Sequence, residues 1–214
     1  MQLKRPTICL SKDHMVSRLF IKKERSGQMV PVTSMPLNPE QGIASGVFCS
    51  PFRQILINTE ETLRSFGISP GQLRENIVLN SMDVHDMPSG AVLRIGDAQI
   101  RLTFHCEPCF KIKDLVSPKA IMHQRGYLAQ VVHPGVVSTG DAIDILPIQM
   151  DAIPYDPVER IVWLLKKQEN PIFASDLVWR AGLPFSYCRA LPAIIERHSE
   201  IDKKMIKFRM QANE

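Results

Sequence analysis

The chain has 214 residues, of which 44% are hydrophobic and 22% charged, and its formal net charge is +4 at pH 7. This composition is ordinary for a globular protein, and the length allows one large domain or a domain of about 150 residues with a smaller one. No apolar run approaches the roughly 18 residues of a membrane span, and no apolar segment follows the charges of residues 1–6. We therefore expect a cytoplasmic protein with no membrane partner.

Five cysteines occur at irregular spacing, in a chain too long to need disulfide staples: Cys9, Cys49, Cys106, Cys109 and Cys188. The odd number and the spacing argue for reduced thiols in a reducing compartment. The positive charge is spread along the chain, because residues 155–214 carry ten Lys or Arg and eight Asp or Glu. Nucleic-acid-binding proteins usually concentrate their basic residues on one face. The charge distribution therefore does not favour that class.

The first part of the chain, residues 1–152, contains short alternating or β-branched runs separated by Gly and Pro turns. The runs predict strands at residues 15–22, 29–33, 52–58, 75–79, 91–95, 98–104, 127–133 and 142–148. Turns at residues 26–27 and 96–97 would close two hairpins, and Thr59 would cap a short helix that stops at Gly67. We expect a mainly β domain over residues 1–152, a β-barrel or sandwich with small helices.

The pattern changes at residues 154–157 (PYDP), after which apolar residues recur at helical spacing behind an Asp-Pro cap. Further helices are predicted at residues 174–181 and 185–197, where Pro192 must kink or restart the second one. A terminal strand is predicted at residues 204–210. Three helices and a strand indicate a small helical, winged-helix-like domain over residues 155–214.

The segment 105–111 (HCEPCFK) carries two cysteines directly after a predicted strand. A structural zinc site would need two more ligands, and the spacing of the nearby histidines matches no zinc pattern. A dithiol redox pair would need a βαβ context, which is absent from the pattern. Two inert buried cysteines are a third reading, since free Cys is among the most buried residue types.

A single reactive thiol is the fourth reading of this segment. A short helix is predicted from Pro108 to about residue 116, which would place Cys109 at its N-terminus. The helix dipole and free N–H groups there lower a thiol pKa, and Lys111 and Lys113 add positive charge. Such a thiolate suits a soft metal or a transferable sulfur.

Seven short segments follow one another in an order that is informative when taken together. They are 53–57 (RQILI), 60–63 (EETL), 70–77 (PGQLRENI), 93–98 (LRIGDA), 108–109 (PC), 125–132 (RGYLAQVV) and 140–143 (GDAI). Over residues 42–148 this order resembles the MOSC domain, the module found at the C-terminus of molybdenum-cofactor sulfurases and in small bacterial proteins. The resemblance implies a β-barrel and makes Cys109 the functional thiol. In the family this cysteine is thought to bind the molybdenum of the molybdenum cofactor (molybdopterin) or to carry sulfur.

The resemblance also implies an activity, because related proteins reduce N-hydroxylated compounds. It implies a molybdenum-dependent oxidoreductase or a sulfurtransferase, with a small N-hydroxylated substrate or a sulfur donor and acceptor, and with an electron-transfer partner. The candidate catalytic residue and metal ligand is Cys109, and the candidate cofactor-binding residues are Cys109, Glu75, Asn76, Arg53 and Lys111.

Three of these candidates have local alternatives, and the chain departs from the family at two positions. Glu75 and Asn76 either orient a ligand or cap a local turn, and Arg53 either faces the pocket or pairs on the surface. Arg74 stands where Gly is common, and no acid and histidine follow Gly46. These departures concern substrate handling more than the fold.

The C-terminal region faintly resembles the winged-helix part of DNA alkyltransferases, through residues 181–184 (AGLP) and 189–191 (RAL). The alkyl-accepting Pro-Cys-His-Arg motif is absent, so no alkyl transfer is implied. Arg180, Arg189 and Arg197 could contact phosphates, although Pro192 breaks the would-be recognition helix. The region is therefore either a packing or homodimerisation module, or the part of a non-enzymatic protein that senses a ligand or binds DNA.

Overall fold

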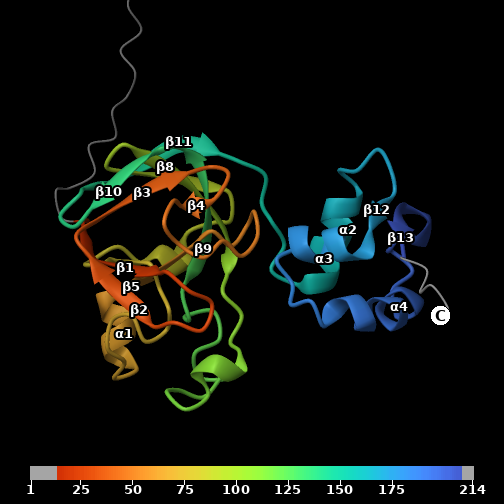
Figure 1. Ribbon diagram of the computed structural model, residues 1–214, viewed down its shortest axis with the longest axis horizontal. Coiled ribbons are helices and arrows are strands. Elements are labelled where there is room, and N and C mark those ends of the chain that lie inside the picture. The colour runs from red at the N-terminus through yellow and green to blue at the C-terminus, as the bar shows by residue number, and fades with distance from the viewer. Residues whose placement is uncertain (1–13, 209–214) are drawn as a thin grey trace, which may run out of the picture.

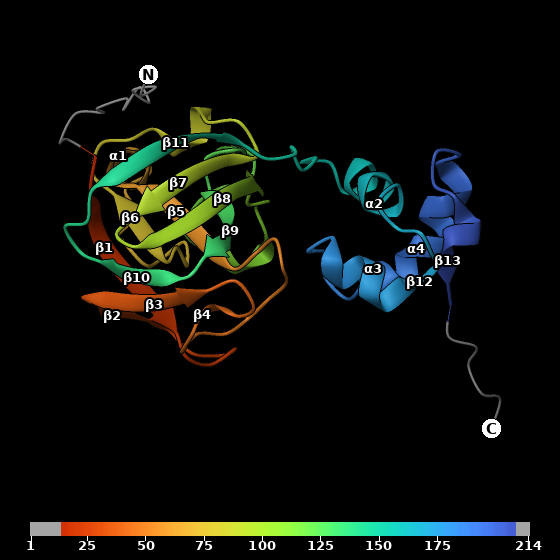
Figure 2. The same ribbon diagram turned by 90° about the horizontal axis from the view of Figure 1, so that it is seen from above.

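The computed structural model describes residues 14–208. A β-rich part and a group of helices lie beside each other, joined by an extended linker (Figure 1; Figure 2). Within the described residues, no helix has the length and apolar character needed to cross a bilayer.

The β-rich part is built on an eight-stranded mixed sheet with the order β11-β7-β8-β9-β5-β6-β1-β2. Its strands are β1 Val16–Lys22, β2 Met29–Val32, β5 Ile55–Thr59, β6 Ile77–Leu79, β7 Ala91–Ile95, β8 Ala98–His105, β9 Tyr127–His133 and β11 Ile143–Gln149. A second sheet has the order β10-β3-β4 and consists of β10 Gly135–Ser138, β3 Ser34–Asn38 and β4 Gly42–Ile43. The mainly β class is thereby confirmed.

The large sheet curls without closing into the expected barrel. Its edge strands β11 and β2 do not pair in the described part of the chain. The start of β1 reaches the start of β11 only through an isolated antiparallel bridge between Met15 and Ala142. The strands β3 and β10 pair with each other in the second sheet, which contacts β1, β8 and β9 of the large sheet. The sequence prediction missed both strands, because their apolar residues are few and are interrupted by Pro36 and short loops.

Local signals account for several of the observed elements. The predicted hairpins are found as β1–β2 and β7–β8, both antiparallel. The helix α1 (Glu60–Ser65) begins where predicted, because the Thr59 side chain accepts a hydrogen bond from the Thr62 N–H. It ends before Gly67, whose φ of 64° belongs to the left-handed region that suits glycine.

The predicted helix over residues 108–116 is wrong. The segment forms only a 3₁₀ turn at Phe110–Ile112, preceded by Cys109 in an extended conformation with φ −138°. Phe110 is 74% exposed, while Ile112 is buried in a cluster with Leu63 and Ile121. Val116 packs against the same cluster and its N–H donates to the Ile112 carbonyl, but beyond the 3₁₀ turn the backbone of residues 113–116 forms only turns. Cys109 therefore does not lie at a helix N-terminus, and the expectation that a helix dipole activates its thiol no longer applies.

The helices follow the linker and share an apolar core. They are α2 Pro157–Leu165, α3 Ala174–Arg180 and α4 Tyr187–Arg197, with a short parallel pair of strands, β12 Ile172–Phe173 and β13 Ile206–Lys207. The Asp156 side chain caps α2, as predicted, by accepting from the Val158 and Glu159 N–H groups. Ile161, Leu177 and Leu191 are completely buried in this core.

Two details of the helical part differ from the sequence prediction. Pro192 lies inside α4, which continues through it. The predicted strand at residues 204–210 is reduced to β13, and its last two residues lie outside the described range. The two short strands run parallel, whereas the wing of a winged helix is an antiparallel hairpin. The winged-helix assignment is therefore not confirmed.

Candidate functional site

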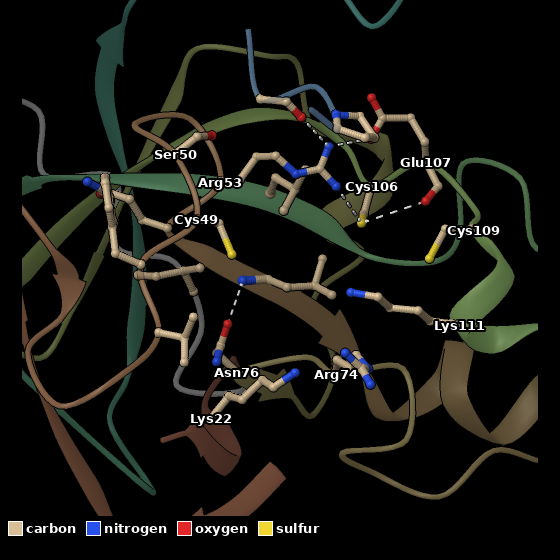
Figure 3. Close-up of a pocket in the computed structure, with 18 of the residues that line it drawn as sticks. Lys22, Cys49, Ser50, Arg53, Arg74, Asn76, Cys106, Glu107, Cys109 and Lys111 are labelled. Atoms are coloured by element: carbon tan, nitrogen blue, oxygen red, sulfur yellow. Dashed lines mark hydrogen bonds and ion pairs between the residues drawn. The ribbon is translucent and has the colours of Figure 1, made fainter. Parts of the chain in front are cut away.

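A pocket of ≈ 750 Å³ lies where the helical part meets the β-rich part. Four of the five predicted site residues line it: Arg53, Asn76, Cys109 and Lys111. Figure 3 shows their side chains together with those of Cys49, Cys106 and Glu107. The helical part contributes one wall through Trp179, residues 182–184 and Tyr187.

The two cysteines of the 106–109 segment differ in how far they are buried. Cys106 is 3% exposed, and its Sγ accepts hydrogen bonds from Arg125 Nη1 at 2.8 Å and Arg53 Nη2 at 3.5 Å. Burial raises the pKa of Cys106, although both guanidinium groups act in the opposite direction. Cys109 is partly exposed and its thiol points into the pocket (Figure 3). This arrangement favours the reading of one accessible thiol over a matched pair.

The other readings of the segment find less support. Among the residues that the structure describes, no group of three or more His, Cys, Asp or Glu is arranged to hold a metal ion. Cys49, Cys106, Cys109 and Cys188 are all free thiols, and Cys9 lies outside the described residues. A zinc site at residues 106–109 therefore lacks its further ligands.

Glu107 connects residues 106–109, called the thiol segment below, to both the β-rich part and the helical part of the molecule. Its Oε2 accepts a hydrogen bond from Arg53 Nη1 at 2.7 Å, and its Oε1 accepts one from Arg160 Nη2 at 2.9 Å. Burial pushes the pKa of Glu107 upward, but the two guanidinium groups outweigh it, so this pKa lies below its usual value. The carboxylate is charged at neutral pH and is neutralised by its two partners. Arg53 thus faces the pocket, which settles the alternative left open by the sequence.

Positive charge dominates the pocket. Its lining includes one carboxylate, Glu107, and six cationic side chains: Lys22, Arg25, Arg53, Arg74, Lys111 and Arg125. The pKa of Lys22 is lowered by burial and then by repulsion from Arg74 and Lys111. Two buried polar atoms on lining residues, Ser50 Oγ and Arg125 Nε, have no hydrogen-bond partner among the described residues. Uncompensated cations and unpartnered polar groups are the features that an anionic ligand would satisfy.

The neighbouring predicted residues Glu75 and Asn76 have different surroundings. Glu75 is completely buried outside the pocket lining, where its carboxylate accepts a hydrogen bond from the Gly71 N–H and burial raises its pKa. Glu75 therefore takes the role of a turn cap, the local alternative that the sequence left open, and it does not line the pocket that contains the other predicted site residues. Asn76 lines the pocket, but its amide bonds the Leu56 N–H at 3.0 Å and the Phe20 carbonyl at 3.1 Å. Through these two hydrogen bonds Asn76 links strands β5 and β1 beneath the pocket.

The departure at Arg74 has a conformational explanation. Its φ of 68° lies in the left-handed region, where glycine is free of strain and other residues are uncommon. The chain keeps this backbone shape and adds a cation to the pocket. Several other pocket residues were missed by the sequence prediction, namely Lys22, Arg25, Cys49, Ser50, Glu107, Arg125 and Trp179. Only the run of charges at residues 22–25, at the end of β1 and in the turn after it, could have indicated some of them.

A second, smaller pocket lies on the other side of β8. Because successive strand residues face opposite sides, His105 points away from Cys106, into a pocket of ≈ 360 Å³ that His85 and His123 also line. Burial lowers the pKa of His85 to about 4 and also lowers that of His105. Both rings are therefore neutral at neutral pH. The His85 and His105 rings are stacked, with centroids 6.0 Å apart.

Comparison with known proteins supports one family. Residues 50–144 match the family model of the MOSC domain. No curated protein matches the sequence. Among solved structures, the YuaD protein from Bacillus subtilis is 17% identical with a TM-score of 0.55, over 62% of this chain and 94% of that chain.

Two further structures match a larger share of the chain. A hypothetical protein is 18% identical with a TM-score of 0.55, over 89% of this chain and 93% of that chain. YiiM from Escherichia coli is 16% identical with a TM-score of 0.51, over 88% of this chain and 96% of that chain. Such coverage exceeds what residues 1–152 could supply, so the likeness in fold extends into the C-terminal helices.

Proposed function

Because residues 50–144 of this chain form a MOSC domain, we propose that the cationic pocket binds the molybdenum cofactor and that Cys109 is its protein ligand to molybdenum. The function that we propose is the reduction of N-hydroxylated compounds at this site. The observation that carries the proposal is the partly exposed Cys109 thiol at the wall of a pocket lined by six cations and one neutralised carboxylate.

The chemistry of the lining residues fits this cofactor. A thiolate is a soft ligand of the kind that favours soft metals, and Cys109 offers it from a rigid Pro-Cys step. A phosphate group on the cofactor would be held by Lys22, Arg74 and Lys111, of which the last two already repel Lys22 in the free pocket. The unpartnered Ser50 Oγ and Arg125 Nε would gain hydrogen-bond partners.

The bound cofactor would supply the two-electron chemistry of the reaction. Conversion of an N-hydroxylated group to an amine consumes two electrons and two protons and releases water, so an electron donor must reach the pocket. The chain's own residues bind and orient the reactants. Glu107 is neutralised by Arg53 and Arg160 and therefore does not repel an anionic cofactor. The wall supplied by Trp179 and Tyr187 narrows access for water.

The test is metal and pterin analysis of protein made in a host that synthesises the cofactor. We expect molybdenum and pterin to copurify with the parent protein and with Cys188→Ser, which changes a thiol packed among the helices. Cys109→Ser should lose the metal and the reductase activity. Cys109→Ser protein with the parent's metal content and activity would overturn the proposal. Mass spectrometry for a persulfide on Cys109 tests the sulfur-carrying alternative on the same samples.

The contrasting proposal, ligand sensing or DNA binding by the helical part, rests on Arg180, Arg189 and Arg197, which are all exposed. Glu196 and Glu200 are exposed beside them, which weakens the attraction for phosphates. DNA binding would appear as affinity for duplex DNA that falls with salt and is lost in the Arg189→Ala, Arg197→Ala double variant. Absence of binding at low salt would reject it.

A further inference from the structure

The helical part contacts both segments that carry pocket thiols. Trp179 Nε1, on α3, donates a hydrogen bond to the Cys49 carbonyl at 3.0 Å, and the Trp179 ring packs edge-on against Phe48 with centroids 6.0 Å apart. Arg160, on α2, holds Glu107, the residue after Cys106 and two before Cys109. The two contacts lie on different helices and reach different thiol segments.

Arg160 is itself held firmly. It is completely buried, and its guanidinium donates to the carbonyls of Pro154, Tyr155 and Ala181 as well as to Glu107. The guanidinium carbon also lies 3.5 Å from the centroid of the Phe104 ring, on β8. Its donors are therefore committed to the linker, to the end of α3 and to the thiol segment at once. A shift of α2 relative to β8 would break this set.

The thiol segment has little freedom to respond independently. Arg125 Nη1 holds it from the β-rich side, through Cys106 Sγ at 2.8 Å and the Glu107 carbonyl at 2.7 Å. Pro108 restricts the backbone between Glu107 and Cys109, because its ring fixes φ. The position of the Glu107 carboxylate is therefore transmitted to the Cys109 thiol through a short, stiff connection.

We infer that the helical part positions the pocket thiols, with Arg160 acting on Cys109 through Glu107 and Trp179 acting on Cys49. Arg160, Glu107 and Trp179 are positioning residues in this proposal. The helices thus belong to the thiol site, and their attachment decides which way the Cys109 thiol faces. This inference concerns the protein without any cofactor and goes beyond the proposed function.

The alternative is that these contacts only hold the helical part in place. Thiol alkylation distinguishes the two roles, because it reports each cysteine separately in the apo protein. The measured quantity is the ratio of alkylation rates with small iodoacetamide and with bulkier N-phenylmaleimide, determined for each cysteine by peptide mass spectrometry. Both reagents react with the thiolate, so the ratio reports access and cancels most changes in thiolate fraction.

The variants are Glu107→Gln, Arg160→Lys and Trp179→Phe. In the parent protein, we expect Cys109 to favour the small reagent because its thiol faces the pocket. Glu107→Gln and Arg160→Lys should lower the Cys109 ratio by about threefold or more and make Cys106 reactive, with Cys188 unchanged. Trp179→Phe keeps an aromatic ring but removes the N–H donor, and should change the ratio at Cys49 alone.

The matched control is Arg94→Lys, which alters the exposed ion pair between Arg94 and Asp144. The proposal is overturned if the ratios at Cys106 and Cys109 stay at the parent values. It is equally overturned if the ratio of alkylation rates at Cys188 changes in parallel. This thiol packs among the helices, so a change there would report a general loss of packing. Trp179→Phe is judged at Cys49, where an unchanged ratio would overturn the part of the proposal that concerns Trp179. If Arg160→Lys does not fold, the Glu107→Gln ratios at Cys106 and Cys109 decide in its place.

Discussion

The guanidinium of Arg125 lies against the buried thiol of Cys106, with Nη1 2.8 Å from Sγ and 2.7 Å from the carbonyl oxygen of the next residue. Arg125 ends the loop before β9, and Cys106 follows β8. Their contact therefore ties together the two chain segments that flank the accessible Cys109.

Replacing Arg125 with lysine tests how much this contact stabilises the fold. One ammonium group cannot reproduce the planar fork that reaches both acceptors. We expect Arg125→Lys to lower the free energy of unfolding by about 1.5–3 kcal/mol, the range for losing hydrogen bonds of a charged group. The measurement is urea denaturation. Arg94→Lys, at an exposed ion pair, is the control and should stay within about 0.5 kcal/mol of the parent. Equal effects of the two substitutions would contradict the prediction.

The glycines after α3 and α1 form a matched pair for testing the approach of Arg53 to the helical part. Gly182 has a φ of 67° and Gly67 a φ of 64°, so alanine suffers similar backbone strain at both, about 1–2 kcal/mol. An added Cβ at Gly182 would lie 2.7 Å from Arg53 Cδ, whereas at Gly67 nothing lies within 4 Å.

We expect Gly182→Ala to destabilise the protein by about 1–3 kcal/mol more than Gly67→Ala, because Arg53 is held by Glu107 and cannot easily move. Denaturant unfolding of both variants under identical conditions measures the difference. Equal losses of stability in Gly182→Ala and Gly67→Ala would show that the Arg53 side chain moves aside at no measurable cost.

The partly buried His85 predicts a dependence of stability on pH. Its pKa falls from 6.5 to about 4 on folding because of burial, so the unfolded chain binds a proton in the interval where the folded protein does not. Stability contributed by neutral His85 is present above pH 6.5 and is lost as pH falls toward 4.

His85→Gln removes this loss, since glutamine does not titrate and can still donate to Asn58 Oδ1, the present ring partner at 3.2 Å. We expect the stability of the parent relative to the variant to fall by up to about 3 kcal/mol between pH 7 and pH 4. Unfolding curves across that range provide the measurement, and His133→Gln, at an exposed histidine of β9, is the control. A constant difference between parent and His85→Gln would refute the assignment.

The N-cap of α2 predicts a contribution to the stability of the protein. Asp156 Oδ1 accepts from the N–H groups of Val158 and Glu159 at 2.8 and 3.1 Å. Asp156→Ala should cost about 1 kcal/mol of stability, the usual value for a lost N-cap. Thermal unfolding measures it, with Asp114→Ala at an exposed loop position as the comparison. An unchanged midpoint in Asp156→Ala would show that the cap contributes nothing here.

Local patterns in the sequence predicted those features that depend on neighbouring residues. Alternating apolar residues indicated most strands of the large sheet, and Thr59 and Asp156 marked the starts of two helices that the structure confirms. The Pro-Cys step and the ordered segments around it identified the family and pointed to Cys109. For the strands and the helix starts, the physical cause lies within a few residues of the chain, namely strand periodicity or capping hydrogen bonds.

Only the tertiary structure decided how the site is assembled and which neighbours its residues have. Glu107 is 54 residues from Arg53 and 53 from Arg160, so no local pattern could pair them. The segment after Cys109 forms a 3₁₀ turn in place of the predicted helix, and the buried Glu75 caps a turn. Long-range ion pairs and burial depend on which surfaces meet in the fold. The charge of the pocket and the access to its thiol therefore emerged only from the folded chain.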